Sequence, residues 1–124
     1  MGCCGIRGAT SVPRNDEREI LDATKTLLER IVSENAIPLE RIVSVIFTAT
    51  ADLNAVYPAR AARELGWRET PLLCALDMDV PGSLPRCVRV LLQANIDRAP
   101  DQVRHVYLGE AKSLRPDWAE EVAI

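Results

Sequence analysis

A long amphipathic helix is the feature that most constrains the fold. Residues 15–35 carry apolar side chains at near-helical spacing, which predicts one apolar stripe along the helix. Asn15 or Asp16 can cap its N-terminus, and Glu17 and Glu19 suit the positive end of the helix dipole. We interpret this element as a packing helix and assign it no chemistry.

The other predicted elements are short. We expect strands at 4–12, 42–50, 71–75, 87–94 and 103–108, and a second helix that begins at Pro58 and ends at Leu65. The strand at 42–50 is nearly all apolar and β-branched, which predicts burial on both of its faces. This order of elements predicts an α+β fold with a mixed β-sheet and helices on one side.

The stretch 76–90 is predicted to form a β-hairpin. Its turn contains Pro81 and Gly82, because proline restricts φ and glycine permits positive φ. Asp77 precedes the turn and Arg89 follows it, so pairing of the flanks would bring an acid and a base to one pocket. A buried charge without a partner costs about 3–5 kcal/mol. The alternative is a solvated hairpin with scattered charges.

Arg89 has an unusual setting within its predicted strand. The residues that alternate with it are all apolar: Val88, Val90, Leu92 and Ala94. Arg89 itself shares a face with Cys87 and Leu91, which is uncommon for a solvated charge.

Arginine supplies most of the basic residues, with only Lys25 and Lys112 as lysines among the 15 Lys+Arg. A net charge of -3 argues against general nucleic-acid binding. Arg7 lies in a strand between two glycines, either in a site with room around it or at an ordinary bulged edge. Arg60 and Arg63 are neighbours on the second helix, where they form either a solvated face or a cationic rim over a pocket.

The 124 residues are expected to form one domain, with 118–124 as a flexible tail. Four cysteines without a Cys-x-x-Cys pair, together with one histidine, argue against a zinc site, and we expect no metal. No signal peptide or long apolar run is evident, so a soluble, cytoplasmic protein that does not enter membranes is expected.

The sequence lacks the motifs that several common catalytic mechanisms require. The sequence has no glycine-rich phosphate loop and no Gly-x-Ser-x-Gly elbow, and nothing singles out a dyad of Cys74 or Cys87 with His105. The arginines, the strand-borne phenol of Tyr107 and Asp77 suit a small polyanion that carries a hydroxyl group.

Seven segments, in this order and spacing, resemble the monofunctional chorismate mutases of the trimeric, AroH-like class. They are GIRGAT (5–10), ATADL (49–53), YPARAAR (57–63), MDVPG (78–82), CVRV (87–90), RHVYL (104–108) and LRPD (114–117). The resemblance implies a homotrimer with a pseudo-α/β barrel and active sites at subunit interfaces. It also implies the Claisen rearrangement of chorismate to prephenate, on the route to Phe and Tyr, without a metal or organic cofactor.

The resemblance also implies roles for individual residues. Arg7 and Tyr107 would hold a substrate carboxylate, and Arg89 would lie against the ether oxygen of the breaking C–O bond. The remaining substrate-binding positions fall into two sets. The backbone of the first set would surround the ring hydroxyl of the substrate: Leu73, Cys74, Ala75 and Leu76. The second set would line the mouth of the active site from a neighbouring subunit: Tyr57, Arg60, Arg63 and Leu114.

Three positions depart from the family pattern. Asp77 stands where the family usually has Glu, and its shorter side chain is expected to lower the rate or weaken binding without abolishing activity. Tyr57 replaces a Phe and Arg60 replaces a Lys, and both changes are mild.

Two rival functions remain. One is a non-catalytic trimer that binds a small carboxylate metabolite, with Asp77 marking lost activity. The other is the Rid-type imine deaminase family, whose trimers are similar in fold. It ranks last because its signature motifs are not evident.

Overall fold

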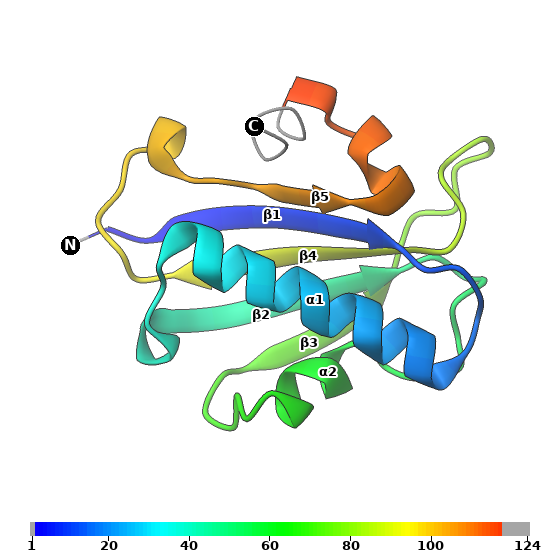
Figure 1. The fold of residues 1–124 in the computed structure, drawn as a ribbon, viewed down its shortest axis with the longest axis horizontal. Coiled ribbons are helices and arrows are strands. Elements are labelled where there is room, and N and C mark those ends of the chain that lie inside the picture. The colour runs from blue at the N-terminus through cyan, green and yellow to red at the C-terminus, as the bar shows by residue number, and fades with distance from the viewer. Residues whose placement is uncertain (1, 118–124) are drawn as a thin grey trace.

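The computed structural model describes residues 2–117, which form a five-stranded sheet with both α-helices on one face (Figure 1). The strands and α-helices are, in chain order, β1 (Cys4–Ser11), α1 (Glu17–Asn35), β2 (Ile42–Ala49), α2 (Ala59–Glu64), β3 (Leu72–Leu76), β4 (Cys87–Ala94) and β5 (Val106–Leu108). Three 3-10 turns accompany them: η1 (Leu39–Arg41), η2 (Pro100–Gln102) and η3 (Gly109–Ser113). None of the helices in this described part is long and apolar enough to cross a membrane.

The sheet is mixed, as predicted. Its strand order is β3-β2-β4-β1-β5, with β4 antiparallel to both β1 and β2. Strand β3 is parallel to β2, and β5 is parallel to β1. The predicted tail at 118–124 lies outside the described residues.

Helix α1 packs closely on the centre of the sheet. Asp16 caps it by accepting a hydrogen bond from the Glu19 amide at 3.0 Å. A Cβ atom at Gly8 would lie 2.7 Å from the Cδ1 atom of Ile31. Gly8 is therefore needed for close helix packing, rather than to leave room around Arg7.

The prediction that β2 is covered on both faces is wrong for this chain. Val45 and Phe47 are buried beneath the helices, whereas Ile46 is 37% exposed on the opposite face. A run of apolar β-branched residues predicts a strand, but it does not show whether elements of the same chain cover both faces of that strand. The face opposite the helices, called the open face below, therefore carries apolar side chains.

The predicted hairpin at 76–90 is also wrong, because β2 lies between β3 and β4 in the sheet. The β2–α2–β3 unit makes β3 a parallel neighbour of β2, and residues 77–86 form a connection past the end of β2. The Asp77 amide extends the β2–β3 ladder by donating to the Ala49 carbonyl at 2.9 Å.

Strand β5 is shorter than predicted because side chains occupy two of its expected pairing positions. The Asn35 amide bonds both the N–H and the carbonyl of Arg104, each at 2.8 Å. The Nδ1 atom of His105 accepts a hydrogen bond from the Arg7 amide at 2.9 Å. Regular backbone pairing to β1 therefore begins only at Val106.

Candidate active site

One row of residues crosses the open face of the sheet. Ala75, Thr48, Arg89, Ala9 and Tyr107 are successive cross-strand partners on β3, β2, β4, β1 and β5. Paired residues point to the same face of a sheet, so Arg89 and Tyr107 flank the small side chain of Ala9. The register of the sheet brings these two predicted site residues together.

Arg89 pairs with Asp77 although their strands are not neighbours. The Nε atom of Arg89 lies 3.0 Å from Oδ2 of Asp77, and both side chains are largely buried. The contact is an ion pair without hydrogen-bond alignment, because Arg89 Nε has no hydrogen-bond partner among the described residues. The other oxygen of Asp77, Oδ1, accepts from the Met78 amide at 3.1 Å.

A depression of about 310 Å³ opens beside this pair. Its walls come from β1, β2 and β4 and from the residue after β3, and they comprise Arg7, Ile46, Thr48, Asp77, Arg89, Val90 and Leu91. Its size is at the lower end of the range for small-molecule sites. Two guanidinium groups in one depression favour an anionic ligand.

Tyr107 is buried at the end of the row, where it packs with Cys87 and Ala111. Burial raises the pKa of Tyr107, and the nearby positive charges of Arg7, Arg115 and Arg89 oppose this increase. The phenol therefore stays protonated at neutral pH and can donate a hydrogen bond.

The backbone N–H of Arg7 forms a hydrogen bond with a side chain, in addition to the pairing of β1 with β4. Because the Arg7 N–H donates to Nδ1 of His105, the imidazole must be unprotonated at that nitrogen. The strand predicted at 103–108 includes His105, but nothing in its pattern indicates that the imidazole holds Arg7. Thr48 and Arg115 were likewise missed, since neither stands out without knowledge of its neighbours.

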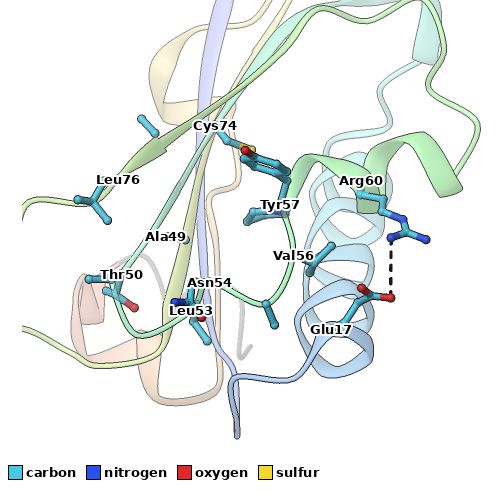
Figure 2. A pocket seen from close by; sticks show the side chains of 14 residues that line it. Glu17, Ala49, Thr50, Leu53, Asn54, Val56, Tyr57, Arg60, Cys74 and Leu76 are labelled. Carbon is cyan, nitrogen blue, oxygen red and sulfur yellow. Dashed lines mark ion pairs between the residues drawn. The ribbon is translucent and has the colours of Figure 1, made fainter.

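Tyr57, Arg60, Arg63 and Cys74 form a second group, around α2 and the edge strand β3. They line a depression of about 400 Å³. An adjoining hollow has a volume of about 670 Å³. Tyr57 and Cys74 point into it, and Arg60 turns away toward Glu17 (Figure 2). The Nη1 atom of Arg60 lies 3.8 Å from Oε2 of Glu17. Burial raises the pKa of the Cys74 thiol, so it is not a reactive thiolate at neutral pH.

The structure therefore divides the predicted site residues. The first group, which we call the arginine row after two of its members, consists of Arg7, Asp77, Arg89 and Tyr107. Within residues 2–117, the depression of about 310 Å³ beside Arg89 is lined by none of Tyr57, Arg60 and Arg63. Leu73 and Leu76 are exposed on β3, and Ala75 belongs to both surfaces because it pairs with Thr48 and lines the hollow of Figure 2.

Within one chain, Leu114 lies apart from Tyr57, Arg60 and Arg63. Leu114 packs in the cluster around Tyr107 of the same chain. The 3-10 turn η3 brings it there, because that turn folds back over the end of β1. The Glu110 amide at its start donates to the Ser11 hydroxyl at 3.0 Å.

The described residues contain no cluster of three or more His, Cys, Asp or Glu side chains that could hold a metal ion. The arrangement instead offers fixed positive charge, a protonated phenol and one carboxylate. Such groups can bind and orient a small polyanion and stabilise negative charge that develops on it.

Comparison with known proteins identifies the family. A sequence model of chorismate mutase type I matches residues 3–118. The chain belongs to the type I chorismate mutase family. This confirms the resemblance found in the seven sequence segments.

Two relatives of this type I chorismate mutase cover nearly its whole length. Chorismate mutase AroH of Bacillus subtilis (strain 168) is 51% identical over 114 residues, which span 91% of this chain and 90% of the relative. Chorismate mutase AroH of Thermus thermophilus is 49% identical over 114 residues, which span 91% and 93%.

A solved structure confirms the α+β fold of the chorismate mutase. Chorismate mutase from Clostridium thermocellum Cth-682 superposes with a TM-score of 0.87 at 44% sequence identity. The match covers 89% of this chain and 98% of that one.

Proposed function

We propose that this type I chorismate mutase converts chorismate to prephenate by a [3,3] Claisen rearrangement, within the shikimate route to phenylalanine and tyrosine. Family membership over residues 3–118 is the observation that carries the proposal. The arginine row supports it, because chorismate and prephenate are dicarboxylates and two arginines share one depression with a carboxylate.

The reaction needs no proton transfer and no nucleophile, because it is an intramolecular rearrangement. The protein has to hold chorismate in the folded conformer that brings the reacting carbons together. We assign this task to Arg7 and Tyr107, which would bind carboxylate, and to Asp77, which would accept a hydrogen bond from the ring hydroxyl. The backbone of 73–75 would complete the pocket around that hydroxyl.

Arg89 would stabilise the transition state. As the C–O bond breaks, negative charge builds on the ether oxygen, and a guanidinium fixed beside that oxygen binds the transition state more tightly than the substrate. The ion pair with Asp77 and the side chain of Leu91, two residues along the same face of β4, restrict the motion of Arg89. Preorganisation of this kind avoids a reorganisation cost during the reaction.

A homotrimer with interfacial active sites accounts for the division of the site residues. Tyr57, Arg60 and Arg63 of one subunit would close the arginine row of the next, forming a pseudo-α/β barrel. Exposed apolar side chains support burial at an interface, since Leu73 is 61% and Ile46 37% exposed. Leu114 would contribute from the subunit that carries Tyr107. We further propose that the protein forms one domain and acts in the cytoplasm.

Turnover of chorismate tests the activity. Purified protein is expected to consume chorismate and release prephenate without added metal or cofactor, and EDTA is expected to have no effect. Ultraviolet absorbance follows the loss of chorismate, and chromatography identifies the product. A correctly folded trimer that binds a bicyclic diacid mimic of the transition state without turnover would instead indicate the non-catalytic binding protein.

Asp77→Glu tests the departure from the family pattern. The variant is expected to equal or exceed the wild-type kcat/KM, because one more methylene extends the carboxylate further from its backbone. Steady-state kinetics with chorismate measure this ratio. Asp79→Glu adds the same methylene to an exposed residue and is the matched control. A steep decrease for Asp77→Glu would show that the pocket is adapted to the shorter acid.

A further inference from the structure

Thr48 has an unsatisfied hydroxyl in the middle of the open face. Its Oγ1 atom is buried and has no hydrogen-bond partner among the described residues. The hydroxyls of Thr10, Thr24 and Thr26 all donate to backbone carbonyls, at 3.0, 2.7 and 3.0 Å. A buried polar group without a hydrogen-bond partner destabilises a folded protein. A group from outside this chain could satisfy the Thr48 hydroxyl by forming a hydrogen bond with it.

The position of Thr48 indicates that this partner is a ligand. Thr48 lines the 310 Å³ depression with Arg7, Asp77 and Arg89. It is the direct cross-strand partner of Arg89, whose Nε atom is also buried without a hydrogen bond. Directly opposed residues have Cβ atoms about 4.5–5.5 Å apart, so one ligand atom can contact both side chains.

The charge of the depression determines the direction of the hydrogen bond. A threonine hydroxyl can donate or accept. Asp77 lines the same depression and would accept from a ligand hydroxyl. The guanidinium groups of Arg7 and Arg89 instead attract oxygens that are anionic or carry no hydrogen, and such oxygens only accept. The side chain of Thr48 would therefore act as a donor beside Arg89.

We propose that Thr48 donates a hydrogen bond to the substrate oxygen that faces Arg89, as a second donor to the charge that develops there. The identity of the substrate rests on the proposed function. Because the hydroxyl has no hydrogen-bond partner among residues 2–117, its contribution would appear in catalysis and not in folding.

Thr48→Val tests this proposal, because valine keeps the shape of threonine and removes the hydroxyl. We expect kcat to fall about tenfold, the effect of one neutral hydrogen bond, with a smaller change in KM. Thr48→Ser should recover most of the loss, because it restores the donor. The thermal unfolding midpoint of Thr48→Val should not decrease, since the substitution removes no hydrogen bond within the described part of the chain.

Thr10→Val is the matched control on the helix side of the sheet. It removes a hydroxyl that donates to the Ser11 carbonyl, so it should lower the unfolding midpoint and leave kcat and KM unchanged. An unchanged kcat for Thr48→Val would overturn the proposal. A loss confined to KM, or a Thr48→Val protein that fails to fold, would overturn it too.

The activity of the wild-type protein separates this proposal from the proposed function. If the wild type leaves chorismate unchanged, the proposed function fails, and calorimetry with a bicyclic dicarboxylate mimic still tests Thr48. Weaker binding by Thr48→Val with binding retained by Thr48→Ser would support the hydrogen bond. Equal binding by all three proteins would overturn it.

Discussion

Replacing Arg89 with alanine is expected to lower kcat by about 10²–10³-fold, the usual loss for one preorganised donor to a developing oxyanion. KM should change much less, because the guanidinium interacts most strongly with the charge that appears in the transition state. Steady-state kinetics with chorismate give both constants. Arg89→Lys should recover only part of the loss, since a lysine lacks the planar fork of donors.

The ion pair with Asp77 requires a control for folding. Arg89→Ala leaves a largely buried carboxylate without its partner, which destabilises the protein. The double variant Arg89→Ala/Asp77→Asn removes that charge and should recover stability without recovering kcat. Circular dichroism and the oligomeric state establish that each variant is folded. A loss for folded Arg89→Ala that appears only in KM would contradict the assigned role.

Mixing two impaired variants is expected to restore activity if the site is interfacial. Arg89→Ala damages the arginine row, and Arg63→Ala damages the group around α2. Loss of a charge-assisted hydrogen bond through Arg63→Ala should cost about 10–100-fold. When equal amounts are unfolded and refolded together, about one quarter of the sites in a closed ring contain two intact halves. The mixture should therefore approach one quarter of wild-type activity.

Arg7→Ala mixed with Arg89→Ala is the matched control for this experiment. Both substitutions lie in the arginine row, so every site in the mixture has a damaged half and no activity should return. Light scattering should give three times the 13.7 kDa chain mass for each preparation. A mixture of Arg89→Ala and Arg63→Ala that shows only the average of its two parents would place the whole site within one subunit.

Local patterns in the sequence predict much of the chemistry. The alternation in 87–94 places Arg89 on one face with Cys87, Leu91 and Gln93, opposite a wholly apolar face. The structure shows Arg89 largely buried beside Asp77. The pairing was one of two alternatives that the sequence left open, and the hairpin on which it depended is wrong. The two residues do not meet across a hairpin, because β2 lies between β3 and β4. Asp77 follows β3 and binds the last residue of β2 through its amide, and this places its carboxylate beside Arg89 of β4.

Thr48, His105 and Arg115 had no comparable signal. A threonine in an apolar strand is ordinary, and its importance lies in the partners that its hydroxyl lacks. His105 matters because its imidazole replaces a backbone acceptor for Arg7, and Arg115 matters because it lies near Tyr107. Such relations join residues that are distant in the chain, and local spacing carries no information about them.

The long helix, the strands and their alternating faces are predictable from local sequence, because they depend on side-chain periodicity and capping over a few residues. Only the tertiary structure decided the order of the strands, which aligns Thr48, Arg89 and Tyr107 in one row. It also decided that both helices cover the same face and leave the other open. The physical reason is that strand order and layer packing are determined by the burial of the whole core, to which every element contributes at once.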